Sequence, residues 1–325
     1  MSITAASSTA PTNHTATVTA MYHPTLGVHD LEVAREWFRR VFDRPDFRWE
    51  DTLDPDLLDP EYPRNYSFFF FIKDLHYVVL CPELHAQGAL KGQTRYRDVP
   101  EGMIGVGWYT DNAVTMFDQL TQHGFTSHDQ KGRRITADNP PVSPMAPDIY
   151  VGFTDPGPAG YRHEFVEIGE RHLEYYARQA DPRLRPGWML PPVDPADPLQ
   201  IVRTSHHTFI TTDLDRATRL YVDAAGGRII NRGRNAALQA DSTYVALGDS
   251  VVEFAVPDPE SPAAQTAANG LDYYKGITLQ VADLNAVQTH LNRVSVTCHR
   301  DGDLVTIEPA DAFGMQWRFI TGRPY

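Results

Sequence analysis

Two histidines occupy equivalent places in two similar stretches of the chain, and both could do chemistry. His23 lies seven residues before Asp30, and His206 lies seven residues before Asp213. In each stretch, alternating apolar residues predict a half-buried strand, and the aspartate is placed to cap the helix that follows. An imidazole can bind a metal ion or transfer a proton near neutral pH. The two histidines are therefore the first candidate functional residues.

Three other residues carry groups of the same chemical kind. Glu253 lies in an apolar strand segment, where a carboxylate is seldom buried without a partner, so we expect it to contact a metal ion or Arg318. Glu164, in the segment Tyr161–Ile168, could face either the functional site or solvent. His76 could supply a missing ligand or a general base, or it could be a hydrogen-bonded histidine of the core.

The elements that must position these residues form a repeating pattern. Strand–helix units start near His23, Ile104, His206 and Gly276, and each is followed by further short strands. Six prolines separate the second unit from the third. Because one such sheet cannot close a core alone, the units should pair. We therefore predict an α+β protein of four tandem βαβββ modules that form two domains.

The predicted organisation assigns residues 1–18 to a disordered tail, 19–170 to an N-terminal domain, 171–202 to a proline-rich linker and 203–325 to a C-terminal domain. The start of the chain lacks the basic and apolar regions of a secretory signal. No apolar run approaches the roughly 20 residues of a membrane helix. Two cysteines, Cys81 and Cys298, are too few for a disulfide framework, which favours a cytoplasmic protein.

The composition excludes some classes of partner. The chain has 325 residues, of which 42% are hydrophobic and 22% are charged, as expected of a globular protein. Its formal net charge of −13 argues against nucleic acid or an anionic membrane as a partner. A small molecule is the expected ligand, and a homodimer is possible.

Three segments of the sequence resemble a known superfamily. The run from His23 to Leu31 has the pattern H-x4-V-x-D-L, and it resembles the first strand and helix of the vicinal oxygen chelate superfamily. This superfamily includes glyoxalase I, extradiol ring-cleaving dioxygenases and the bleomycin- and fosfomycin-resistance proteins. The segment Asp155–Glu164 resembles its D-P-D-G-x-x-x-E ending with an insertion, and Gly248–Glu253 resembles the end of an odd-numbered module. The resemblance implies paired modules whose sheets curve into cups.

The resemblance also implies metal ligands on the first and last strands of each module. Those positions are His23, Ile104, His206 and Gly276 on the first strands, and Val78, Glu164, Glu253 and Arg318 on the last strands. Four of them can bind a metal: His23, Glu164, His206 and Glu253. The implied cofactor is a divalent metal, Fe(II) first with Zn, Mn or Ni as alternatives, that chelates two neighbouring substrate oxygens.

The pairing of the modules decides which ligands meet. If module one pairs with two and module three with four, His23 and Glu164 share one cup, while His206 and Glu253 share the other with Arg318. If module two pairs with three, Glu164, His206 and Glu253 converge. Both arrangements stay open at the level of sequence.

The resemblance implies a metal-dependent enzyme that acts on a small aromatic or enol-forming substrate with vicinal oxygens. An extradiol ring-cleaving dioxygenase is the first expectation. However, Gly276 and Arg318 stand where such a dioxygenase keeps a His and a Glu. A glyoxalase-type lyase or isomerase, and a metal-free ligand-binding or resistance protein, therefore remain alternatives.

Overall fold

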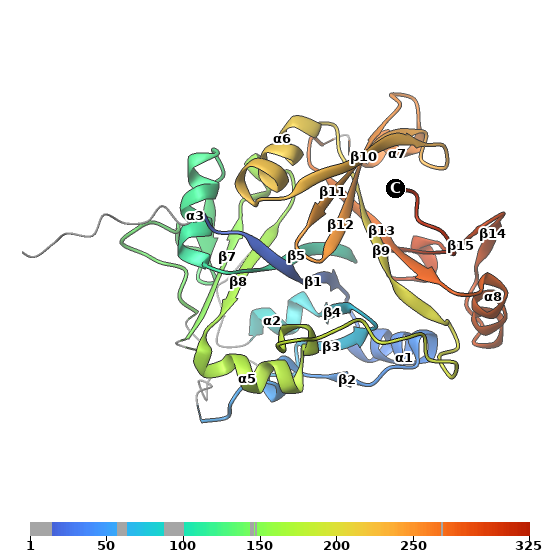
Figure 1. Ribbon diagram of the computed structural model, residues 1–325, viewed down its shortest axis with the longest axis horizontal. Coiled ribbons are helices and arrows are strands. Elements are labelled where there is room, and N and C mark those ends of the chain that lie inside the picture. Colours follow the sequence, from blue (N-terminus) through green and yellow to red (C-terminus); the bar gives the residue numbers. More distant parts are fainter. Residues whose placement is uncertain (1–14, 57–63, 88–100, 144–145, 147, 268) are drawn as a thin grey trace, which may run out of the picture.

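The chain folds into two eight-stranded sheets that are each partly wrapped by helices (Figure 1). The computed structural model describes residues 15–56, 64–87, 101–143, 146, 148–267 and 269–325. Within this part of the chain, no helix is long and apolar enough to cross a membrane. Most of the predicted tail, residues 1–14, lies outside the described residues.

The first sheet is built from residues 18–168, and the connector that follows it runs from residue 169 to residue 200. Module one contains β1 (Val18–Gly27), α1 (Leu31–Phe42), β2 (Asp46–Phe47), η1 (Trp49–Asp51), β3 (Ser67–Ile72), β4 (Leu75–Leu80) and α2 (Pro82–Gln87). Module two contains β5 (Gly102–Thr110), α3 (Ala113–Gln122), β6 (Ser127–Asp129), β7 (Ile149–Thr154), α4 (Pro156–Ala159) and β8 (His163–Ile168). The connector contains α5 (Glu170–Gln179) and η2 (Pro182–Leu184).

The second sheet repeats this arrangement. Module three contains β9 (Ile201–Ile210), α6 (Leu214–Thr218), the π-helical η3 (Arg219–Ala224), β10 (Arg228–Asn235), β11 (Ala240–Leu247), β12 (Ser250–Pro257) and α7 (Pro262–Thr266). Module four contains β13 (Tyr273–Val281), α8 (Leu284–Arg293), β14 (His299–Asp301), β15 (Leu304–Ile307), η4 (Pro309–Asp311) and β16 (Gln316–Ile320).

The strand order shows how the modules pair. The first sheet runs β2-β3-β4-β1-β5-β8-β7-β6, and the second runs β10-β11-β12-β9-β13-β16-β15-β14. The two modules of each sheet join through one antiparallel pair, β1 with β5 and β9 with β13. The α+β fold of four paired βαβββ modules is thus confirmed, and the alternative in which module two pairs with module three is wrong.

Helix caps set the transition from strand to helix in both halves. The Asp30 carboxylate accepts hydrogen bonds from the backbone amides of Glu32 and Val33. Asp213 accepts one from the amide of Arg216 in the same way. These bonds satisfy amides that have no partner inside the helix, which is why each helix begins where the sequence pattern predicts.

The two sheets share one hydrophobic core, because helices of one half pack against residues of the other. The ring of Phe42 on α1 lies 4.7 Å from the ring of Trp317 on β16, measured between centroids. Trp108 on β5 meets Tyr221 of η3 edge-to-face at 5.7 Å. The orientation of the two cups is therefore fixed by buried aromatic packing.

The connector binds to the first sheet along its path. After α5, the chain runs past α1 before it enters β9 (Figure 1). Lys73 Nζ donates a 2.5 Å hydrogen bond to the carbonyl of Pro192, and Arg44 Nη2 lies 2.8 Å from Asp197 Oδ2. These contacts hold the connector as part of the folded structure, so its prolines mark a docked segment.

The last residues of the predicted tail are ordered. The amide of Ala16 donates to the side chain of Gln119 at 2.6 Å, and the amide of Thr17 donates to Asp111 at 2.8 Å. Val18 already belongs to β1. The expectation of disorder up to residue 18 is therefore wrong at its end, because hydrogen bonds to module two fix these residues.

Candidate functional site

The cup formed by the first sheet, called the first cup, contains a cavity whose wall includes His23 and Glu164. His23 comes from β1 and Glu164 from β8, and β5 lies between these strands. The Nε2 atom of His23 is 3.9 Å from Oε2 of Glu164. The cavity contains about 670 Å³ of space between its walls, part of it open to solvent. The structure thus brings together the two residues that the sequence predicts for this cup.

A bulge in β1 brings two adjacent residues to the cavity. The register between β1 and β5 shifts between Met21 and Pro24. Successive residues of a regular strand face opposite sides, but an extra residue at a bulge breaks that alternation. As a result, both Tyr22 and His23 line the cavity.

The rest of the wall is apolar and aromatic, with a few polar groups. Rings of Trp49, Tyr66, Phe69 and Phe153 line it together with aliphatic side chains. Five further polar residues also line it: Thr25, Ser67, His85, Gln130 and Ser143. Such a cavity favours a small, flat, partly apolar molecule whose few polar atoms meet fixed partners.

His23 is held neutral and in one orientation. Its side chain is buried, and Nδ1 lies 3.1 Å from Thr25 Oγ1. Burial lowers the pKa of His23 well below its ordinary value of 6.5, and the nearby His76 lowers it further. The Nε2 atom is left on the side of Glu164, so at neutral pH the site pairs a neutral imidazole with a carboxyl group.

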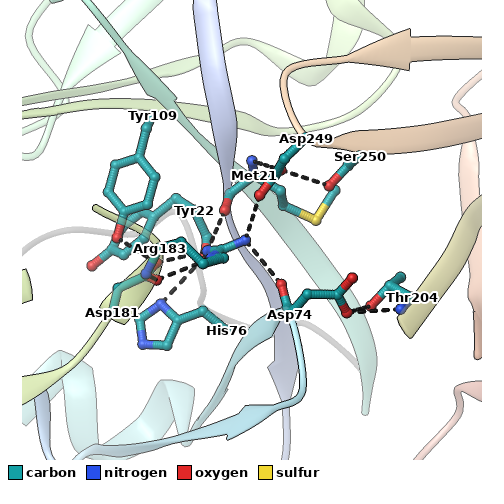
Figure 2. Close-up of polar contacts among 10 residues, drawn as sticks. All are labelled: Met21, Tyr22, Asp74, His76, Tyr109, Asp181, Arg183, Thr204, Asp249 and Ser250. Carbon is teal, nitrogen blue, oxygen red and sulfur yellow. Dashed lines mark hydrogen bonds and ion pairs between the residues drawn. The ribbon is translucent and has the colours of Figure 1, made fainter. Parts of the chain in front are cut away.

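His76, the predicted general base, does not line the cavity. Its side chain is fully buried between Phe47 and Phe69, with its ring stacked on both. Nδ1 lies 3.3 Å from the carbonyl oxygen of Tyr22, as Figure 2 shows. Burial lowers the pKa of His76 to about 4. The ring centroid of His76 is 6.1 Å from that of His23, so His76 lies next to His23 but outside the lining of the cavity.

The second cup contains the other predicted pair, His206 and Glu253, but the Glu253 carboxylate already accepts hydrogen bonds from other side chains. His206 Nε2 lies 3.5 Å from Glu253 Oε2, and both side chains are buried. Glu253 accepts hydrogen bonds from four neutral side chains: Thr208 at 2.7 Å, Asn235 at 2.7 Å, Ser242 at 2.6 Å and Tyr244 at 3.1 Å. Burial alone would raise the pKa of Glu253, but the neighbouring His206 and the hydrogen bonds from Ser242 and Asn235 outweigh burial and hold the pKa well below its ordinary value.

Arg318, one of the two partners that the sequence suggested for Glu253, does not pair with it. Among the described residues, Arg318 has no carboxylate within 4 Å, and its Nη1 is buried without a hydrogen-bond partner. The reason is that β12 and β16 are separated by β9 and β13 in the sheet. Thr278 of β13 lies beside His206 on one side and beside Arg318 on the other.

The convergence of Glu164 with His206 and Glu253, which the alternative pairing of modules two and three implies, does not occur. Glu164 belongs to the first sheet and the other two residues to the second. His163 and His207, neighbours with opposite strand parity, are buried in the core, where they contact the hydroxyls of Tyr221 and Tyr274. They have the structural role that their parity predicts.

The donor set does not fit the three-ligand site of a ring-cleaving dioxygenase. Within the described part of the chain, no group of three or more His, Cys, Asp or Glu residues is placed to hold a metal ion. In the first cup, β5 places Gly107 beside Glu164 and Gly105 beside Thr25, so neither position offers a donor atom. Val78 on β4 is apolar. His23 and Glu164 could supply at most two protein ligands.

Sequence reasoning missed several residues of the cavity wall. Trp49 comes from η1, His85 from α2, and Gln130 and Ser143 from the irregular segment between β6 and β7. Their places depend on how loops fold over the open side of the sheet. No periodicity in the sequence marks such positions.

Three solved structures share the fold across almost the whole chain. An extradiol ring-cleaving dioxygenase from B. fuscum matches with a TM-score of 0.54 and 11% identity, covering 97% of this chain and 75% of that one. The 2,3-dioxygenase LapB from a Pseudomonas species matches with a TM-score of 0.55 and 12% identity, covering 95% and 94%. A variant of 4-hydroxymandelate synthase from Streptomyces coelicolor matches with a TM-score of 0.55 and 10% identity, also covering 95% and 94%.

The sequence itself gives no such match. No protein-family model matches it, and the comparison with curated proteins finds no relative. The similarity is therefore one of fold, and it agrees with the module pairing and the strand order of the two sheets. The chain therefore shares the fold of these solved dioxygenases, with four βαβββ modules paired into two domains.

Proposed function

We propose that the protein is an enzyme that acts in its first cup on a small aromatic or enol-forming molecule with neighbouring oxygen atoms. The observation that carries this proposal is the opposition of His23 Nε2 and Glu164 Oε2, 3.9 Å apart, in a cavity walled by aromatic rings. The named relatives in fold are enzymes, and two of them are dioxygenases.

The chemistry that this pair favours is proton transfer. With Thr25 at Nδ1, a neutral His23 can present an N–H at Nε2. That N–H can donate to a substrate oxygen and stabilise the negative charge that develops on it. Glu164 can then take a proton from the carbon or hydroxyl next to that oxygen. This is the reaction of an isomerase or lyase, and it uses only residues that line the cavity.

The metal requirement and the ring-cleaving reaction remain predictions. A divalent ion, Fe(II) first with Zn, Mn or Ni as alternatives, would have His23 and Glu164 as protein ligands and would polarise the substrate oxygens. Because the described residues offer two ligands and not three, we rank proton transfer above oxygen-dependent ring cleavage. His76 is proposed to position His23 from behind, not to act as the base.

The test is proton exchange at carbon. Phenylpyruvate carries acidic C–H protons beside a carbonyl, and their replacement by deuterium in D₂O can be followed by proton NMR. We expect chelator-treated protein to accelerate this exchange, and Glu164→Gln to slow it by about a hundredfold or more, because a general base is lost. Glu36→Gln, at an exposed position on α1, is the matched control and should exchange like the unchanged protein.

Two results would contradict the proposal. Exchange that is equally fast with Glu164→Gln would remove Glu164 as the base. Oxygen uptake with catechol that depends on added Fe(II) and on His23, in the absence of any C–H exchange, would support the ring-cleaving reaction instead. A measurement of the bound metal in the purified protein and in His23→Ala completes this comparison.

A further inference from the structure

We propose that the second cup is a binding site for a small oxyanion, a carboxylate or phosphate group, held by Arg318. A second cavity opens in this cup and contains about 920 Å³ of space between its walls, part of it open to solvent. Arg318, Lys275, Gln316 and Thr306 are among the residues that line it. None of these residues belongs to the first-cup site, so the proposal is independent of the function assigned there.

The first observation is a half-buried guanidinium with one buried N–H group that lacks an acceptor. Nη1 of Arg318 is buried and makes no hydrogen bond, and no carboxylate of the described residues lies within 4 Å of the side chain. Oγ1 of Thr278, the neighbour on β13, is also buried without a partner. Buried polar groups are rarely left unpaired, and an unpaired charge is the most costly case. An oxyanion beside Arg318 would satisfy the guanidinium.

The second observation is a second cation on the same cavity. Lys275 stands at the register shift between Tyr274 and Gly276, where β13 bulges, and its side chain reaches the cavity. It forms no ion pair within 4 Å among the described residues. Burial lowers the pKa of Lys275 below its ordinary value of 10.5, and the nearby Glu308 opposes this shift. Two cations without ion pairs therefore border one cavity.

Two acidic side chains also border the cavity, and they do not neutralise these cations by contact. Glu308 accepts a 3.1 Å hydrogen bond from Gln316 Nε2, and Asp301 lies at the exposed edge strand β14. Neither lies within 4 Å of Lys275 or Arg318. They reduce the net positive charge at the cavity, so a small oxyanion with one or two charges fits better than a polyanion.

The third observation concerns Glu253, the buried carboxylate of β12 in the second sheet. Four neutral side chains already donate hydrogen bonds to the Glu253 carboxylate. Glu253 is therefore satisfied without Arg318, and its oxygens are not available to bind an added cation. The planar guanidinium of Arg318 matches the two oxygens of a carboxylate or phosphate in a bidentate geometry. Apolar side chains of Leu238 and Leu304 in the wall can receive the rest of an organic anion.

The test is calorimetric titration of the full chain at pH 7.5 and constant ionic strength. The probes are benzoate and inorganic phosphate, titrated separately to distinguish an organic carboxylate from a phosphate. We expect saturable binding of at least one probe, with affinity about tenfold or more lower in Arg318→Gln, since a hydrogen bond to a charged group is lost. Arg228→Gln, at an exposed position on β10, should bind like the unchanged protein.

Thr278→Val keeps the shape of a buried side chain and tests the site without changing its charge. It should weaken binding by about threefold to tenfold, because one neutral hydrogen bond is lost. The proposal is overturned if neither probe binds. It is also overturned if Arg318→Gln or Thr278→Val binds both probes like the unchanged protein. Loss of binding in His23→Asn, with Arg318→Gln unaffected, would place the anion in the first cup and overturn it as well.

Discussion

The guanidinium of Arg183 lies 3.1 Å from the carboxylate of Asp249, and this contact ties the connector to the second sheet (Figure 2). The same side chain pairs with Asp181 at 2.7 Å and donates to the carbonyl oxygens of Met21 and Asp74 at 2.7 and 3.0 Å. Burial would lower the pKa of Arg183, but Asp181 outweighs it and keeps the charge in place. One buried cation thus joins β1, the turn before β4, the connector and the turn before β12.

Replacing this cation should be strongly destabilising. Arg183→Met leaves Asp181, whose side chain is fully buried, without its ionic partner. We expect the free energy of unfolding to fall by about 3–5 kcal/mol, because a buried charge is left uncompensated. Urea titration followed by circular dichroism measures this loss. Arg171→Met, at an exposed position of α5, serves as the control and should cost less than about 0.5 kcal/mol; equal losses in both variants would contradict the assignment.

The buried His76 should make stability depend on pH. Its pKa is about 4 in the folded protein and 6.5 in the unfolded chain, so the unfolded chain binds more protons between these values. The stabilisation is fully present above pH 6.5 and is lost as the pH falls toward 4. From pH 7.5 to 5.0, this group alone should remove about 2 kcal/mol.

Urea unfolding at several pH values checks this dependence. In His76→Gln, the slope of stability against pH should be smaller by the same amount, while His163 and His207, whose pKa values are lowered to about 3, continue to contribute. An unaltered slope in His76→Gln would mean that His76 is not the titrating group.

Glu253 should contribute to stability and not to catalysis. In Glu253→Gln, the amide brings two N–H donors to a place where four donors already point at an acceptor. We expect a loss of about 2–4 kcal/mol, because buried donors are left unpaired. Ser242→Ala, which removes one neutral donor, should cost about 1 kcal/mol. Both variants should keep the first-cup exchange reaction; loss of exchange in a folded Glu253→Gln would show that the second cup takes part.

Much of the fold could be predicted from local sequence. The spacing from His23 to Asp30 recurs from His206 to Asp213, and in both cases a strand leads into a helix capped by the aspartate. The local pattern left two ways of pairing the modules open. That choice depends on antiparallel contacts between strands far apart in the chain, such as β1 with β5, which local patterns do not encode.

The candidate site could be predicted only in part. The pairs His23–Glu164 and His206–Glu253 meet as the module pattern predicts for adjacent pairing. The absence of a third ligand in the second cup has a steric reason that no pattern reveals. A Cβ atom at Gly276 would lie 2.0 Å from the carbonyl oxygen of Gln316, so no side chain can stand there. The partners of Glu253 were missed because Ser and Asn in strands look like ordinary surface residues.

Because one hydrophobic core spans both sheets, neither half of the chain is expected to fold stably without the other. Aromatic side chains of α1 contact Trp317 and Phe313, and Trp108 contacts Tyr221. These side chains would be exposed to water if either half were produced alone. Exposed aromatic surface of this kind promotes aggregation. A gene cut at the proline-rich connector would therefore yield two insoluble fragments, although each carries a complete eight-stranded sheet.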